Sequence, residues 1–192
     1  MIHLQHGIPP DQVETAARLY WQAFGGKLGR VMGPDARALR YLGRIIQTDH
    51  AIAALHEGNL VGMIGFKTPQ GSFADGTPAD MRAVYGAAGV AWRMPLLWAL
   101  SREVDNTRFL IDGIAVDRNY RSHGIGTALI DAACDLARAR GYPALRLDVV
   151  DTNWRAKALY ARLGFKIEKT ASIGPLRHVF GFAAATTMVR DV

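Results

Sequence analysis

Cysteine is nearly absent from this 192-residue chain, which contains only Cys134. A single cysteine excludes an internal disulfide framework and a zinc site built from several cysteines. Long apolar runs are missing as well: the run near the middle of the chain, Met94 to Leu100, is far shorter than the roughly 20 residues that cross a bilayer. The first residues also lack the basic start and apolar stretch of a secretory signal. The sequence therefore predicts a cytoplasmic protein that does not bind membranes.

Acidic residues are in the minority, with 17 Asp and Glu against 23 Lys and Arg, so the formal net charge is +6. Such an excess suits either a solvated basic surface or an anionic partner. The arginines are scattered and accompany no nucleic-acid-binding motif, so an anionic small molecule is favoured over nucleic acid. No set of His, Cys, Asp and Glu has the spacing of a metal site, and we expect no metal.

Apolar periodicity and turn residues predict strands and helices that alternate in the C-terminal half. We expect strands near 2–5, 51–56, 60–67, 109–116, 144–150, 165–173 and 177–190, and helices near 11–24, 34–47, 124–140 and 153–163. Gly25, Gly26 and Gly29 are expected to end the first helix. Residues 68–107 begin as a loop and continue as a helical or irregular segment. The pattern indicates a single α/β domain with a mixed sheet that is flanked by helices and has antiparallel edges.

The most informative stretch runs from Ile114 to Thr127 and reads as a strand, a basic turn, two glycines and a long helix. The start of a helix presents unpaired N–H groups and the positive end of its dipole. Gly124 and Gly126 would let a ligand approach that backbone closely, and Arg121 adds a positive charge. This combination suits a pyrophosphate, although turn geometry alone would also explain the glycines. The third glycine of a dinucleotide fingerprint and the Gly-Lys-Ser/Thr ending of a P-loop are both missing.

Two motifs resemble the GNAT superfamily of acetyl-CoA-dependent N-acetyltransferases. Arg121-Ser122-His123-Gly124-Ile125-Gly126 fits the family's pyrophosphate loop, Arg/Gln-x-x-Gly-x-Gly/Ala. Residues 153–165, Asn-Trp-Arg-Ala-Lys-Ala-Leu-Tyr-Ala-Arg-Leu-Gly-Phe, are similar to the family's Asn-x-x-Ala-x-x-Leu-Tyr-x-x-x-Gly-Phe. The resemblance is close over 109–166. It implies one domain over 1–192 with an insertion at about 68–107, and a mixed sheet whose two central parallel strands splay to admit the pantetheine arm.

The resemblance also implies which residues bind acetyl-CoA. The backbone of the strand residues Ile114, Ala115 and Val116 would pair with the pantetheine amides. The diphosphate would be held by the loop residues Arg121, Ser122, His123, Gly124, Ile125, Gly126 and Thr127. The helix would contribute Asn153, Ala156 and Tyr160. The last three share one helical face. Asn153 is also a good N-cap, which is a structural alternative to a cofactor contact.

A catalytic role is implied for two residues. Tyr160 corresponds to the family's tyrosine that protonates or hydrogen-bonds the departing CoA thiolate; packing between a helix and the sheet is its structural alternative. A base is needed because an amine with a pKa of ~10.4 costs about 4.6 kcal/mol to deprotonate at pH 7. Asp112 is the first candidate and Asp148 the second, while the family's acidic position, 110, is Leu here. His50, His56 and His123 are weaker candidates.

We therefore expect an N-acetyltransferase that moves an acetyl group from acetyl-CoA to a primary amine of a small-molecule or amino-acid-like acceptor. Cys134 is more typical of packing than of a nucleophile, so direct attack on the thioester is predicted. A peptide N-terminus or lysine as acceptor, and an acyl-CoA sensor without turnover, are the alternatives.

The aromatic residues of 68–107 indicate a helix packed on the sheet, a wall of the acceptor pocket, or an association surface that would suit a homodimer.

Overall fold

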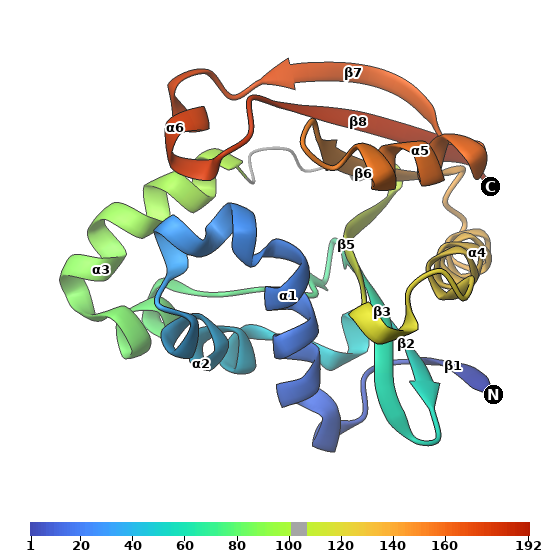
Figure 1. Cartoon of the computed structure of the whole chain (residues 1–192), viewed down its shortest axis with the longest axis horizontal. Coiled ribbons are helices and arrows are strands. Elements are labelled where there is room, and N and C mark those ends of the chain that lie inside the picture. The colour runs from blue at the N-terminus through green and yellow to red at the C-terminus, as the bar shows by residue number, and fades with distance from the viewer. Residues whose placement is uncertain (101–106) are drawn as a thin grey trace.

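An open, mixed β-sheet of eight strands runs through the computed structural model, which describes residues 1–100 and 107–192 (Figure 1). The strands are β1 (Ile2–His6), β2 (Ala51–His56), β3 (Asn59–Thr68), β4 (Gly71–Ser72), β5 (Phe109–Val116), β6 (Ala144–Val150), β7 (Lys166–Ser172) and β8 (Ala184–Asp191). Their spatial order is β1-β2-β3-β5-β6-β8-β7, and β4 pairs with β3. β5 and β6 are parallel, whereas the other described pairs are antiparallel, which confirms the predicted mixed sheet.

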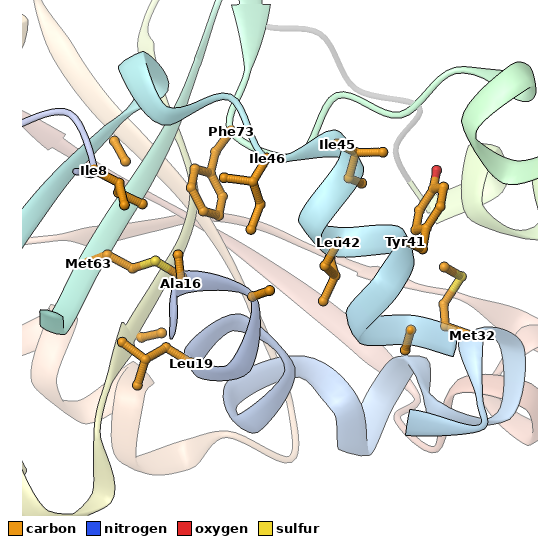
Figure 2. Close-up of a cluster of buried hydrophobic side chains, with 14 of the residues drawn as sticks. Ile8, Ala16, Leu19, Met32, Tyr41, Leu42, Ile45, Ile46, Met63 and Phe73 are labelled. Carbon is orange, nitrogen blue, oxygen red and sulfur yellow. The ribbon is translucent and has the colours of Figure 1, made fainter. Parts of the chain in front are cut away.

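Helices cover both faces of the sheet. They are α1 (Val13–Met32), α2 (Asp35–Ile45), α3 (Pro78–Leu100), α4 (Ile125–Ala139), α5 (Trp154–Arg162) and α6 (Arg177–Phe180), with short 3-10 helices at Pro10–Gln12, Thr48–His50, Arg118–Tyr120 and Gly174–Leu176. α1 and α2 pack on one face, in the cluster drawn in Figure 2, and α4 packs on the opposite face (Figure 1). None of the described helices combines the length and apolar character needed to cross a membrane.

Strand β2 shows how the sheet separates two cores. Ala51 and Ala53 belong to the cluster under α1 and α2, whereas Ile52 and Ala54 belong to the cluster under α4. Successive strand side chains point to opposite faces. All four are buried, so β2 reads as a continuous apolar run because both of its faces are covered.

The two parallel strands diverge shortly after they begin. β5 and β6 pair only at Phe109 with Leu145 and at Leu110 with Arg146. Beyond Leu110, β5 stays paired with β3 on its other edge and β6 stays paired with β8. The sheet therefore splays between β5 and β6, as predicted.

Helix α1 is longer than predicted, because it continues through Gly25, Gly26 and Gly29 to Met32. Each glycine costs about 1 kcal/mol relative to alanine inside a helix. The last turn, however, buries Val31 and Met32, whose exposed fractions are 0% and 4%. Full burial of two such side chains contributes about 1.5–3 kcal/mol each, which offsets the glycines. The expected end of the helix near Phe24 is wrong.

The expected strand over 177–190 is wrong in its first part. Residues 177–180 form α6, which ends at Gly181 in the left-handed conformation (φ 73°). Strand β8 begins only at Ala184. Phe180 and Phe182 on either side of this turn are both buried, so the turn places two aromatic rings in the α1 and α2 core.

Residues 68–107 include β4 and α3, while 101–106 lie outside the described part of the chain. Gly86 interrupts α3 with a non-helical backbone (φ 71°, ψ 175°). The Tyr85 hydroxyl donates a hydrogen bond of 2.5 Å to the Met32 carbonyl, and Arg93 Nε donates one of 2.7 Å to the Val31 carbonyl. Because the last carbonyls of a helix lack intrahelical partners, α3 caps the end of α1 and is held against it.

Candidate active site

The turn between β5 and α4 is built as an anion-binding loop. Ser122 and Gly124 both have positive φ angles, 65° and 77°, so the chain curls before α4 starts. No side chain caps the first turn of α4, which leaves its N–H groups to face a ligand. A Cβ at Gly124 would meet no atom within 4 Å, and one at Gly126 would meet only Leu159 Cδ2 at 3.8 Å. The open space over this backbone fits a pyrophosphate.

Arg121 is positioned beside that loop by the backbone. Its Nε donates a hydrogen bond of 3.2 Å to the Val116 carbonyl, and its own carbonyl lies 2.8 Å from His123 Nδ1. Arg121, Ser122, His123 and Gly124 are all exposed, whereas the side chain of Ile125 is buried and anchors the start of α4. The terminal guanidinium nitrogens of Arg121 have no hydrogen bond to the described residues and are free to bind an anion.

The strand residues beside the splay have one edge without a strand partner. Ile114, Ala115 and Val116 pair with β3 on one side, and β6 pairs with β5 only as far as Leu110. Backbone N–H and C=O groups on an unpaired edge can pair with an extended ligand as another strand would. The pantetheine arm, with its amide groups, fits this edge.

The predicted Asn153 caps helix α5, and the predicted Ala156 and Tyr160 lie on that helix and pack against the buried cluster under α4. Asn153 Oδ1 accepts a hydrogen bond of 3.3 Å from the Ala156 N–H, so the structure bears out its N-cap geometry. The Tyr160 ring packs 5.8 Å from the Phe165 ring, centroid to centroid. Burial raises the pKa of Tyr160 to about 12, so its hydroxyl keeps its proton near neutral pH.

A cavity of about 870 Å³ opens on the α1 and α2 face of the splayed strands. Its aromatic wall comprises Tyr20, Trp21, Phe24, Tyr41, Trp98 and Phe182, and its charged residues are Lys27, Lys67, Asp112, Asp148 and Lys169. Met94, Leu97 and Trp98 come from α3. Helix α3, which lies within the segment 68–107, therefore supplies one wall of this cavity, which is one of the three roles considered for that segment.

Asp112 lines the cavity, as Leu110 does two residues earlier, and it lies at a bulge in β5. Gly65 on β3 faces Gly113, and the next residue, Phe66, faces Ile111, so Asp112 is the additional residue. A bulge bends the strand and redirects a side chain. Gly113 is required beside it, because a Cβ there would lie 2.6 Å from Phe24 Cζ.

The Asp112 carboxylate sits in a desolvated environment. Burial raises its pKa, while the hydrogen bond of 3.3 Å from the Ala74 N–H to Oδ2 and the charge of Lys67 lower it by smaller amounts. Burial and the Asp112 charge also raise the pKa of Tyr20. A carboxylate whose pKa lies above its ordinary value is a better proton acceptor, which suits a general base.

Asp148 stands across the splay from Asp112. Each lies two residues beyond the paired Leu110 and Arg146. Asp148 Oδ1 accepts a hydrogen bond of 2.5 Å from Thr187 Oγ1, and Oδ2 lies 3.4 Å from Arg146 Nη2. Both of its oxygens are thus engaged, which favours Asp112 as the base.

The other candidate bases lie outside the cavity lining. His50 lies 2.8 Å from Asp49 Oδ1 and 3.2 Å from Thr68 Oγ1, and His56 Nδ1 lies 3.4 Å from the Tyr120 hydroxyl. His123 belongs to the exposed loop. Cys134 is buried in α4, and burial raises the pKa of its thiol, so it is a packing residue. No group of three or more metal-ligating side chains occurs within residues 1–100 and 107–192.

The family resemblance also implies that the first two helices supply a wall of the acceptor pocket, and α1 and α2 do line this cavity, but sequence reasoning did not name the α1 residues. Tyr20, Phe24 and Lys27 occur at spacings of four and three residues, which places them on one helical face. Tyr20 and Phe24 pack with ring centroids 4.5 Å apart. The spacing from Tyr20 to Phe24 was visible in the sequence, but Lys27 lies beyond the residue where the helix was expected to end.

Comparisons with known proteins match both the sequence and the fold. The model of the acetyltransferase (GNAT) family matches residues 13–165. A streptothricin acetyltransferase of Streptomyces lavendulae is 37% identical over 92 residues, 48% of this chain and 48% of that protein. A mycothiol acetyltransferase of Beutenbergia cavernae is 44% identical over 52 residues, 27% of this chain and 18% of that protein. The chain thus matches about half or less of the length of these curated relatives.

Solved structures share the whole fold at low sequence identity. An N-acetyltransferase from Staphylococcus aureus Mu50 aligns with a TM-score of 0.67 at 16% identity, covering 98% of this chain and 100% of that one. The ribosomal-protein-S18-alanine N-acetyltransferase from Escherichia coli aligns with a TM-score of 0.60 at 17% identity, covering 100% and 94%. These likenesses establish the architecture.

Proposed function

The chain belongs to the acetyltransferase (GNAT) family, and from this premise we propose that it transfers an acetyl group from acetyl-CoA to a primary amine of a small molecule. The observation that carries the proposal is the position of the cavity: it opens at the point where β5 and β6 diverge, and Asp112 lies in its wall. An acceptor in this cavity would meet the end of a pantetheine arm that lies in the splay.

The residues proposed to bind acetyl-CoA come from three segments of the chain. The loop residues Arg121, Ser122, His123, Gly124, Ile125, Gly126 and Thr127 would hold the diphosphate, the backbone of Ile114, Ala115 and Val116 would pair with the pantetheine amides, and Asn153, Ala156 and Tyr160 would line the opposite side. Acetyl-CoA supplies a thioester whose carbonyl carbon accepts the amine. The glycines that leave the loop backbone open support this assignment.

The protein's part in the reaction is proton transfer and positioning. Asp112 would accept the proton of the ammonium, directly or through water, so that the nitrogen lone pair is available for attack. The new C–N bond forms as the C–S bond breaks, and the nitrogen releases its second proton to solvent. Tyr160 would donate its hydroxyl proton to the departing sulfur and recover a proton from solvent. The desolvated carboxylate of Asp112 is thus suited to accepting a proton, and the protonated phenol of Tyr160 is suited to donating one.

The size of the cavity favours a small acceptor over a protein surface. Its walls come from α1, α2 and α3 together with β3, β5, β6, β7 and β8. A volume of about 870 Å³ lies within the range of small-molecule sites. The aromatic lining would contact the hydrophobic part of an amine, and the carboxylates would attract its charge.

Measurement of free thiol release with acetyl-CoA and a panel of amines tests the proposal. We expect release that depends on a small primary amine and yields the N-acetyl product by mass spectrometry. Binding of acetyl-CoA without release for any amine or peptide would instead favour a sensor. Release with peptides alone would contradict the small-molecule acceptor.

A further inference from the structure

Lys27 is a positive charge on the cavity wall that no described carboxylate neutralises. It is half-buried and lines the cavity from α1. Its Nζ lies 5.3 Å from the centroid of the Phe24 ring. Within the described residues, this ammonium has no ion pair and no hydrogen bond. Burial lowers the pKa of Lys27, which reflects the cost of a cation without a partner in a desolvated site.

Neither carboxylate of the cavity lining is a partner of Lys27. Asp112 accepts a hydrogen bond from the Ala74 N–H and has Lys67 as its cationic neighbour. Asp148 is occupied by Thr187 and Arg146. Because both carboxylates of the lining have other partners, Lys27 is available to an anion brought by the ligand.

Helix α1 carries Lys27 on the same face as the residues that lie beside the proposed base. Tyr20 lies close enough to Asp112 for the carboxylate to raise its pKa, and Phe24 packs against Gly113. Lys27 follows on the same helical face. At 1.5 Å per residue, the seven residues from Tyr20 to Lys27 span about 10 Å along the helix axis. The aromatic rings of Tyr20 and Phe24 cover the interval.

We propose that Lys27 binds a carboxylate of the acceptor, so that the substrates are amino carboxylates whose two charged groups are several atoms apart. The amine would lie at Asp112, the connecting chain over Tyr20 and Phe24, and the carboxylate at Lys27. An α-amino acid holds its two groups too close together to reach both ends. This inference rests on the proposed acetyl transfer and specifies its acceptor.

The test uses pairs of acceptors that differ only in charge. Straight-chain ω-amino acids, such as 6-aminohexanoate, are compared with the neutral amino alcohols of the same length, such as 6-aminohexan-1-ol. For the wild-type protein we expect kcat/KM to favour the best acid over its alcohol by at least about tenfold, the range of a charged hydrogen bond. Lys27→Met keeps the aliphatic stem over Phe24 and should abolish the preference through KM of the acid.

Four further measurements separate this role from a structural one. Lys27→Arg should retain the preference, and Lys166→Met, which removes an exposed lysine from β7, should leave it unchanged. Lys27→Met should still unfold cooperatively in a thermal melt and bind CoA as the wild type does, which shows that it folds. Calorimetry of 6-aminohexanoate with the CoA-saturated protein should show binding that Lys27→Met loses.

The outcomes distinguish the inference from the proposed function. Equal efficiency on acids and alcohols in the wild type, or a preference that survives in Lys27→Met, would overturn the role of Lys27 and leave acetyl transfer standing. Binding of the acid that depends on Lys27, without thiol release for any amine, would support the anion site and contradict acetyl transfer. Absence of both binding and preference would overturn the inference.

Discussion

The phosphate loop and the acceptor cavity are specified by the sequence in different ways. The loop is one continuous stretch, residues 117–127, whose conformation follows from local features such as the Asp117 side chain that accepts a hydrogen bond from the Asn119 N–H. The cavity gathers residues from α1, α2, α3, β5, β6, β7 and β8. Its geometry depends on how distant segments pack.

This difference has a functional meaning. The loop and the splay would bind acetyl-CoA, which is the same in every reaction of this type, and their residues are recognisable from their spacing. The cavity would bind the acceptor amine, which varies from one enzyme to another. Helix α3, which caps α1 and contributes Trp98 to the wall, lies within a segment that the two motifs do not cover.

Replacing Asp112 by Asn tests the acceptor cavity, and we expect it to have the largest effect on activity of the variants proposed. We expect kcat to fall by about 10³-fold, within the usual range for a lost general base, while the affinity for acetyl-CoA is retained. The Asn oxygen can still accept the hydrogen bond from the Ala74 N–H. Steady-state kinetics and calorimetry measure the two quantities. Unchanged kcat would remove Asp112 from the mechanism.

The same variant should be more stable than the wild type at neutral pH. The pKa of Asp112 is raised from 3.8 in the folded state, so the folded protein binds this proton more tightly than the unfolded chain. The wild type therefore loses stability relative to Asp112→Asn as the pH rises from about 3.8 through the raised pKa. Melting temperatures at several pH values would show a difference that grows with pH and then levels off.

Tyr160→Phe is expected to have the second largest effect. We expect kcat to fall by about 10²-fold, because the departing sulfur loses its proton donor, with little change in acetyl-CoA binding. Since the pKa of Tyr160 is about 12, the wild-type kcat should show no loss from ionisation of this residue up to about pH 10. Equal kcat values for the wild type and Tyr160→Phe would mean that Tyr160 serves only in packing.

Arg121→Ala tests the loop side. We expect the affinity for CoA to weaken by about tenfold or more, the effect of losing a charged hydrogen bond, and to depend less on salt. Arg118→Ala removes an exposed arginine from the neighbouring 3-10 helix and serves as the matched control. Calorimetry with CoA gives both affinities. An equal loss of CoA affinity in the two variants would mean that the overall positive charge, and not a specific contact of Arg121, explains the effect.

Trp98→Ala is expected to have the smallest effect and to act on the acceptor alone. An aromatic contact contributes about 0.5–1.5 kcal/mol, so KM for the amine should rise by a few-fold while CoA affinity stays constant. Trp92→Ala is the control on the same helix: Trp92 is 44% exposed and Trp98 62% exposed, but only Trp98 lines the cavity. A change in CoA affinity without a change in KM would contradict this division.

Local patterns predicted the region around the loop well, and the reason is physical. β5 and β6 were predicted with their observed ends, because turn residues such as Gly141 and Pro143 delimit their apolar runs. The course of α1 beyond Phe24 was not predictable from helix propensity, since the burial of Val31 and Met32 depends on contacts far along the chain. The bulge at Asp112 likewise depends on pairing with β3.

Calorimetric titration of the purified protein with CoA tests the central claim most directly. We expect saturable binding that weakens in Arg121→Ala and is unchanged in Arg118→Ala. If the wild-type protein gives no binding heat with CoA at millimolar concentration, the loop before α4 and the splay between β5 and β6 do not form a CoA site, and the account is contradicted.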